Sequence, residues 1–118
     1  MKTNPREILL YYNSKSQSDK KTLAYARTMS KHVKVYDYND APSSSTSWAM
    51  VIQSLGRDPK TLLNKAHPEY QANFRGKEFD TFDWINIIQN NPHLMKSPIA
   101  VRGTKAIVVN TPTDILRL

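Results

Sequence analysis

Two short apolar runs separated by one helical stretch occupy the first part of the chain. Residues 8–12 (Ile-Leu-Leu-Tyr-Tyr) form a continuous apolar run that ends at Asn13, and residues 33–37 alternate in polarity. Runs of this length and composition predict strands. From about Asp19 to Ser30 the apolar residues recur at helical spacing. Strand, helix and strand within about 30 residues predict two parallel strands joined by a right-handed crossover.

The middle third predicts helices. One is expected over Trp48–Leu55, capped by a Ser or Thr of residues 43–47 and stopped by Gly56. Trp48 and Trp84 lie on apolar helix faces, so both are predicted core residues. The remaining elements expected here are a short helix opening at Asp58-Pro59, an irregular stretch over 67–76, and a helix behind Asp80 that ends at Asn90-Asn91-Pro92.

The last third predicts a hairpin followed by a helix. Residues 98–101 and 106–109 are apolar and flank the turn sequence Arg-Gly-Thr-Lys at 102–105. A final helix is expected to start at Thr111-Pro112. The parallel pair and the hairpin together predict one α/β domain over residues 1–118. We expect the helices of the middle third to pack over one end of its sheet.

Composition excludes several kinds of chemistry. The 118 residues include no cysteine, which removes disulfides, thiolate metal sites and cysteine nucleophiles. The three histidines, His32, His67 and His93, have no metal-ligand spacing, so neither a metal nor another cofactor is expected. We assign no role to His67 or His93. No apolar run approaches the roughly 20 residues of a membrane span, and no signal peptide is recognisable, so a cytoplasmic location is expected.

The charge balance favours acidic partners. Lys and Arg number 17 against 10 Asp and Glu, which gives a formal net charge of +7. Such a surface suits nucleic acid, phosphorylated ligands or an acidic protein surface, although solubility alone also explains it. The chain contains no P-loop, zinc-finger or RNA-binding motif, so direct nucleic-acid binding is not favoured.

Four segments carry short motifs in a fixed order. They are Tyr12-Asn13-Ser14-Lys15-Ser16 with Lys20-Lys21-Thr22-Leu23-Ala24, then Leu55–Asn64 (LGRDPKTLLN), Asn91–Ile99 (NPHLMKSPI), and Gly103-Thr104-Lys105-Ala106 with Pro112 and Leu116. With these segments at this spacing, nearly the whole chain from Ile8 to Leu118 resembles the arsenate reductase ArsC/Spx family. The resemblance implies a thioredoxin-like fold, with a small mixed four-stranded sheet and a helical insertion in the middle third.

The departures from the family pattern concern its chemistry. The family's nucleophilic cysteine falls on Ser16, and the positions of four family arginines hold Lys20, Asn64, Ser97 and Asn110. Guanidinium groups bind tetrahedral oxyanions bidentately, which neither Lys nor a neutral side chain does. A serine hydroxyl needs an adjacent base to act as a nucleophile, and no histidine lies near Ser16 in sequence. The absence of cysteine therefore excludes thiol-dependent arsenate reduction by the family's mechanism.

The Spx branch offers a second comparison. Its regulators bind the C-terminal domain of the RNA polymerase α-subunit and carry a Cys-x-x-Cys redox switch. Asn64 fits this branch, but the two switch positions hold Ser16 and Asp19. The leading hypothesis is thus a non-catalytic binding or regulatory module, with an acidic protein surface such as the polymerase α-subunit as its partner. The alternative is an enzyme or ligand-binding protein that uses the Asn13–Ser16 loop for glutathione or a phosphorylated small molecule.

We expect a vestigial active-site face that binds ligands or anions. Ser16 is expected to cap the first helix, and N–H groups of its first turn, with Lys15 and Lys20, to bind phosphate or sulfate weakly. The resemblance also implies a cis peptide bond before Pro98, which would present backbone groups of Ser97 to a ligand. The expected face comprises Asn13, Lys15, Ser16, Lys20, Asn64, Ser97, Pro98 and Asn110.

Overall fold

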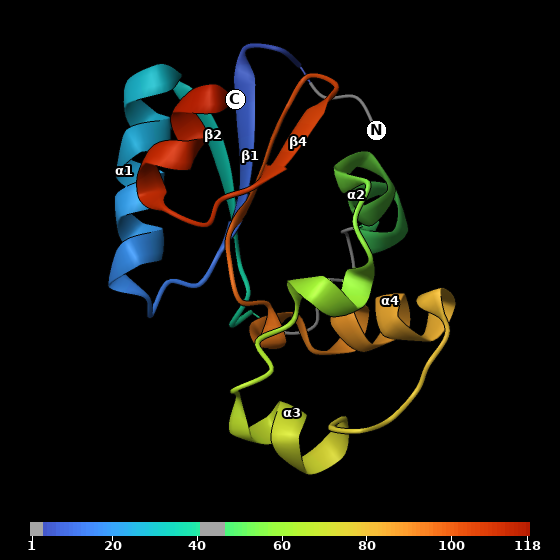
Figure 1. Cartoon of the computed structure of the whole chain (residues 1–118). Coiled ribbons are helices and arrows are strands. Elements are labelled where there is room, and N and C mark those ends of the chain that lie inside the picture. The colour runs from blue at the N-terminus through green and yellow to red at the C-terminus, as the bar shows by residue number, and fades with distance from the viewer. Residues whose placement is uncertain (1–3, 41–46) are drawn as a thin grey trace.

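A mixed four-stranded sheet forms the centre of the computed structural model, which describes residues 4–40 and 47–118. Its strands follow the spatial order β2-β1-β3-β4 (Figure 1). β1 pairs with β2 in parallel and with β3 antiparallel, and β3 pairs antiparallel with β4. The predicted parallel pair and hairpin are therefore both confirmed. The strand bounds are β1 (Glu7–Tyr12), β2 (His32–Asp37), β3 (Ile99–Arg102) and β4 (Lys105–Val108).

Helices flank the sheet. The chain order is β1, α1, β2, α2, η1, α3, α4, η2, β3, β4 and η3, where η marks a 3₁₀-helix. Figure 1 shows α3 and α4 beyond the end of the sheet at which β1 ends, whereas α2 lies beside β4. The helix bounds are α1 (Gln17–Met29), α2 (Trp48–Leu55), η1 (Pro59–Leu62), α3 (Pro68–Asn73), α4 (Thr81–Asn90), η2 (Pro92–Leu94) and η3 (Pro112–Arg117).

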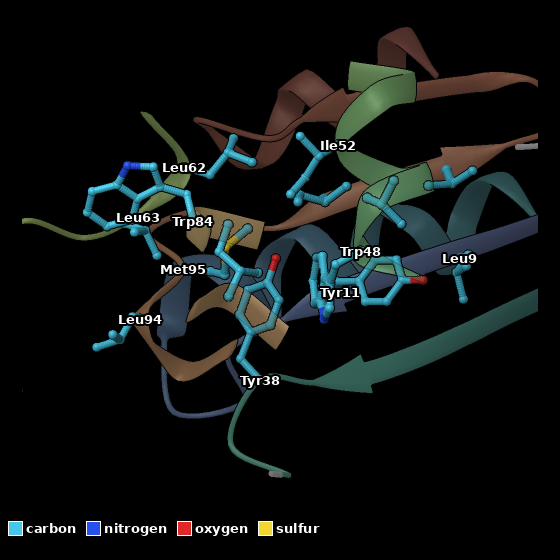
Figure 2. Packing of buried hydrophobic residues seen from close by; sticks show 14 of the residues in the cluster. Leu9, Tyr11, Tyr38, Trp48, Ile52, Leu62, Leu63, Trp84, Leu94 and Met95 are labelled. Atoms are coloured by element: carbon cyan, nitrogen blue, oxygen red, sulfur yellow. The ribbon is translucent and has the colours of Figure 1, made fainter. Parts of the chain in front are cut away.

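Both faces of the central strands are buried, which explains the continuous apolar run of β1. Side chains alternate between the faces of a strand. Ile8 and Leu10 pack with Ala26 of α1 and Ile115 of η3 on one face. On the other face, the neighbours of Leu9 belong to a larger cluster supplied by α2, α4 and the segments around them (Figure 2). That cluster includes Leu9, Tyr11, Trp48, Ile52, Trp84, Ile99 and Val101. The two tryptophans are 1% and 3% exposed, as predicted for core residues.

Local signals set several helix ends. Gly56 ends α2 in a left-handed conformation with φ 65°, which glycine adopts without a steric cost. The Asp80 side chain accepts a hydrogen bond from the N–H of Asp83 at 2.8 Å and so caps α4. Both ends were predicted. For α2, residues 43–46 of the expected capping segment lie outside the described residues, and Ser47 makes no side-chain capping bond.

One expectation for local structure was wrong, and one was confirmed in position but differs in helix type. The stretch 67–76 is not irregular throughout, because it contains α3. His67 caps this helix through Nδ1, which accepts from the N–H of Glu69 at 3.1 Å, and Tyr70 anchors it in the core. The last helix begins at Thr111-Pro112 as expected, but it is a 3₁₀-helix, η3, held by a capping box between Thr111 and Asp114. In the described ranges, no helix is both long and apolar enough to cross a bilayer.

Candidate functional site

The loop between β1 and α1 ends in a helix cap. Ser16 has an extended backbone, and its Oγ accepts a hydrogen bond from the N–H of Asp19 at 3.2 Å. The Ser16 N–H donates to the carbonyl of Asn13 at 3.0 Å, which closes the loop into a turn. The predicted capping role of Ser16 is therefore confirmed, although α1 begins at Gln17, two residues earlier than expected.

Asp19 places a carboxylate inside this loop. Its side chain is largely buried, with the residue 8% exposed. One carboxylate oxygen accepts from the N–H of Asn13 at 2.8 Å and the other from Oγ of Ser16 at 3.3 Å. Burial raises the pKa of the Asp19 carboxyl, and the bonds from Asn13 and Ser16 lower it by less. The loop donors that an external anion would use are thus shared with a carboxylate of the chain itself.

A second carboxylate fixes the loop to the end of β2. Asp37 accepts from the N–H of Ser14 at 3.2 Å, from the Ser14 hydroxyl, and from the N–H and Nδ2 of Asn39 at 3.0 and 2.8 Å. Burial raises the pKa of Asp37, but these hydrogen bonds outweigh it and hold the pKa below its usual value. Nδ2 of Asn39 also donates to Oδ1 of Asn13 at 2.8 Å, so the loop is joined both to the last residue of β2 and to the segment that follows it.

The loop forms one wall of a cavity of about 500 Å³. This volume lies in the range of about 300–1,000 Å³ typical of small-molecule sites. The loop wall comprises Asn13, Lys15, Ser16, Asp19 and Asn39. The facing wall comprises Asn64, His67, His93, Met95 and Lys96.

Backbone pairing between two distant segments builds the facing wall. Leu63 and Met95 form an antiparallel bridge. The N–H of Asn64 donates to the carbonyl of Leu94 at 2.7 Å, and the N–H of Lys96 donates to the carbonyl of Leu62 at 3.0 Å. This short ribbon sets Asn64 and Lys96 at one edge of the cavity. The sequence motifs of the two segments gave no sign of this pairing.

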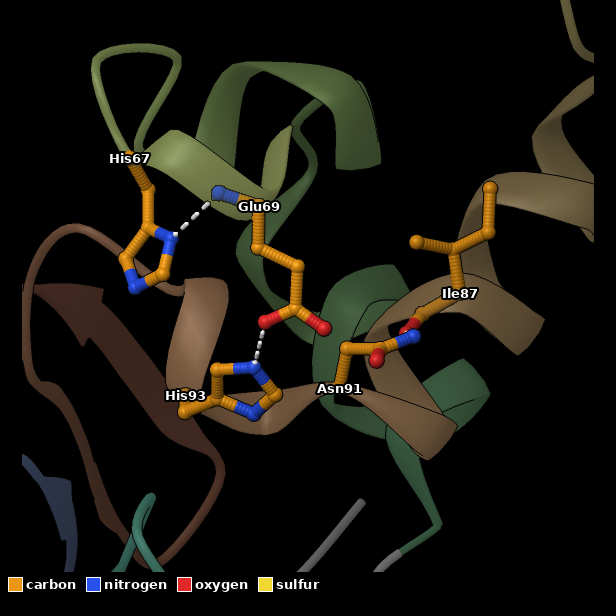
Figure 3. Close-up of polar contacts among 5 residues, drawn as sticks. All are labelled: His67, Glu69, Ile87, Asn91 and His93. Atoms are coloured by element: carbon orange, nitrogen blue, oxygen red, sulfur yellow. Dashed lines mark hydrogen bonds and ion pairs between the residues drawn. The ribbon is translucent and has the colours of Figure 1, made fainter. Parts of the chain in front are cut away.

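Glu69 orients the two histidines of the facing wall (Figure 3). Its backbone N–H donates to Nδ1 of His67 at 3.1 Å, and its carboxylate pairs with Nε2 of His93. The ring centroids of His67 and His93 are 5.8 Å apart in an edge-on arrangement. Sequence reasoning assigned neither histidine a role. The signal that would have found them is position, because His67 follows Asn64 by three residues and His93 precedes Ser97 by four.

The structure gathers half of the expected face and disperses the rest. Asn13, Lys15, Ser16 and Asn64 line the cavity, together with residues that were not predicted. Lys20 is exposed on α1 and is not part of the lining. A different cavity of about 280 Å³ beside β4, lined also by Arg57 and Arg117, contains Asn110.

Ser97 and Pro98 lie next to the lining residue Lys96. Pro98 is buried, and the carbonyl of Ser97 accepts a hydrogen bond from the hydroxyl of Tyr38 at 3.1 Å. This carbonyl, which we expected to be presented to a ligand, therefore has a partner within the protein. The cis conformation of the Ser97–Pro98 bond stays a prediction.

The chemistry of the cavity is that of a polar binding site. The Ser16 hydroxyl donates to Asp19, and no hydrogen bond joins it to either histidine in the described part of the chain. Within residues 4–40 and 47–118, no group of three or more His, Asp or Glu side chains is placed to hold a metal ion. The cavity instead offers two lysines, two histidines and three asparagines.

Comparison with known proteins gives a consistent result. The sequence pattern of the ArsC family matches residues 11–118. An arsenate reductase from Vibrio cholerae superposes with a TM-score of 0.82 at 20% identity, covering 97% of this chain and 98% of the other. A candidate arsenate reductase from Yersinia pestis superposes with a TM-score of 0.81 at 23% identity, covering 94% of this chain and 99% of the other. An arsenate reductase-related protein from Brucella melitensis superposes with a TM-score of 0.66 at 15% identity, covering 98% of this chain and 99% of the other.

These structural likenesses, at such low identities, concern the fold alone. Among curated proteins no sequence matches the chain. The mixed sheet with its flanking helices agrees with the thioredoxin-like architecture of the structural neighbours. Because the family pattern spans nearly the whole sequence, the chain belongs to the ArsC family.

Proposed function

We propose that this ArsC-family protein is a non-catalytic binding module that does not reduce arsenate. The observation that supports this most is the state of the loop between β1 and α1. The residue at the position of the family nucleophile is Ser16, and its hydroxyl is engaged with Asp19. A nucleophilic serine needs a base that removes its proton, whereas the Asp19 carboxylate here belongs to the helix cap.

The electrostatics of the loop support the same proposal. A reactive thiolate and an arsenate oxyanion are both negative, and both require cationic groups close by. Here the buried Asp19 side chain contributes a carboxylate at that place. Lys20 lies outside the cavity, and Asn110 lines a different one. The chain thus lacks the charge arrangement as well as the sulfur.

The partner we propose is an acidic protein surface such as the C-terminal domain of the RNA polymerase α-subunit. The net charge of +7 and the resemblance to the Spx branch support this choice. The test is a titration of the isotope-labelled chain with the purified domain, with amide shifts as the readout. A saturable set of shifts is expected, and their absence at millimolar concentration would refute this partner.

The loss of catalysis is tested separately. The native chain is incubated with arsenate, glutathione and glutaredoxin, and arsenite formation is measured. No turnover above background is expected, and Ser16→Cys alone should restore little, because the surrounding charges are unchanged. Efficient reduction of arsenate by the native chain would overturn the proposal.

A further inference from the structure

The hydrogen bonds of the cavity decide which groups remain for a ligand. Oδ1 of Asn13 accepts from the N–H of Lys15 at 3.0 Å and from Asn39 at 2.8 Å. Oδ1 of Asn64 accepts from the N–H of Ala66 at 3.1 Å. In both side chains the carbonyl oxygen is therefore used inside the protein. The Nδ2 amino group of each side chain, which is a donor, remains for a ligand.

His67 adds a third donor, because one of its ring nitrogens is likewise used inside the protein. Its Nδ1 accepts the N–H of Glu69, so in the neutral ring the proton sits on Nε2. His93 is held the other way, because its Nε2 contacts the Glu69 carboxylate, which can only accept when ionised. The neutral His93 ring therefore keeps an unprotonated Nδ1. That atom is an acceptor for a hydroxyl group of a ligand.

Lys15 and Lys96 complete the donor set with two positive charges. Neither ammonium group forms an ion pair with a carboxylate in the described part of the chain. They lie on opposite walls, Lys15 on the loop and Lys96 on the ribbon that pairs residues 62–64 with 94–96. A ligand between the walls thus meets donors from both sides, and the ligand that satisfies them is rich in acceptors and negatively charged.

We propose that this cavity binds a small organic phosphate monoester, held mainly by Lys96, His67 and Asn64 on the facing wall. A phosphate monoester carries a charge of about −1.5 to −2 near neutral pH and three acceptor oxygens. This charge matches two lysines better than a single carboxylate does. The inference adds a small-molecule ligand to the protein partner proposed above, and it rests on the proposal that this cavity binds without catalysis.

Asp19 determines which wall holds the phosphate. Its carboxylate lines the loop wall and already accepts from the Asn13 N–H and the Ser16 hydroxyl. A phosphate at the start of α1 would therefore meet a negative charge and donors that are already shared. The facing wall has its carboxylate, Glu69, engaged with His93. The remaining volume of the cavity, with Met95 as an apolar part of its lining, has room for the organic part.

The test is a titration of the isotope-labelled full chain with ribose 5-phosphate at constant ionic strength. Amide shifts are expected at Asn64, His67 and Lys96, and side-chain shifts at the NH₂ groups of Asn13 and Asn64. Inorganic phosphate and succinate serve as comparison ligands and should bind more weakly. Shifts confined to residues 16–20, or equal binding of succinate, would overturn the inference.

Matched variants locate the site. Lys96→Gln should raise the dissociation constant about fivefold. This factor corresponds to about 1 kcal/mol, which is the Coulomb attraction of two unit charges 4 Å apart in water. Lys21→Gln makes the same charge change on exposed α1 and should leave the dissociation constant unchanged. His67→Ser keeps a short capping side chain for α3 but places no donor at the position of Nε2, so it should weaken binding in a folded protein. Equal effects of Lys96→Gln and Lys21→Gln would show nonspecific attraction and refute the site.

The result of the ribose 5-phosphate titration can be interpreted independently of the arsenate assay. Arsenate turnover by the native chain would refute the proposed function whatever ribose 5-phosphate does. Failure of ribose 5-phosphate to bind, in a chain that is silent toward arsenate, would refute the ligand class alone.

Discussion

Replacement of Asp19 tests whether its buried carboxylate holds the loop at the start of α1. Asp19→Ala removes the acceptor of the Asn13 N–H and the partner of the Ser16 hydroxyl. A buried donor left without a partner costs about 1–3 kcal/mol. The free energy of unfolding should therefore fall by about 1–3 kcal/mol.

Asp19→Asn separates the charge from the hydrogen bonds. The asparagine oxygen can still accept from Asn13, and its amino group can donate to Oγ of Ser16. Burial raises the pKa of Asp19 in the folded state, so folding favours the uncharged acid. The stability that Asp19 contributes is complete below its unfolded pKa of about 3.9 and is lost as pH rises through the folded pKa. Asp19→Asn should therefore gain stability relative to the native chain as pH rises above about 3.9.

Urea unfolding followed by fluorescence of the buried Trp48 and Trp84 provides the assay. Asp114→Asn is the control, because the pKa of Asp114 is shifted in the opposite direction and its effect on stability should change with pH in the opposite sense. Backbone hydrogen bonding to Thr111 lowers the pKa of Asp114, with a smaller contribution from Arg117, so its stabilising effect is present at neutral pH and lost on acidification. If the native chain gains stability over Asp19→Asn as pH rises, the reasoning about the buried carboxyl is refuted.

Three further predictions concern single contacts. Tyr38→Phe should lower the free energy of unfolding by about 1–3 kcal/mol, measured by urea unfolding, because the Ser97 carbonyl loses its donor; no change would mean that water replaces the hydroxyl without cost. Gly56→Ala should destabilise by about 1–2 kcal/mol in thermal unfolding through its positive φ alone, since nothing lies within 4 Å of an added Cβ. Ser16→Cys should give a thiol with a pKa above the usual value of about 8.5, read from the pH dependence of alkylation, because Asp19 disfavours the thiolate; a pKa below 8.5 would contradict this.

Strong local patterns made the fold predictable in outline. Three of these patterns each span only a few residues: the apolar run of β1, the alternation of β2 and the turn between β3 and β4. Each of them predicted strands where the structure has strands. The six-residue helix α3 was missed because its cap is His67, which is not a common capping residue, and because one buried side chain, Tyr70, anchors it. Tertiary contacts thus decided this helix where local propensity did not.

The candidate site was predictable only on the side that is local in sequence. Asn13, Lys15 and Ser16 lie in one loop, so a motif could find them. His67 and His93 meet across the pairing of Leu63 with Met95, a contact between segments about 30 residues apart that no spacing rule encodes. Asn110 was misplaced for the same reason, because similarity of motif does not fix which cavity a side chain enters.

Asp19 explains how the loop keeps its shape without the family's cysteine. The start of a helix exposes N–H groups that need acceptors, and its positive dipole favours a negative group nearby. Here the Asp19 carboxylate fills that role from within the chain, accepting from Asn13 and Ser16 while its own N–H is capped by Ser16. The loop therefore needs no bound anion to be satisfied. It follows that the positive charges left over, on Lys15 and Lys96, are the ones that remain to attract a ligand.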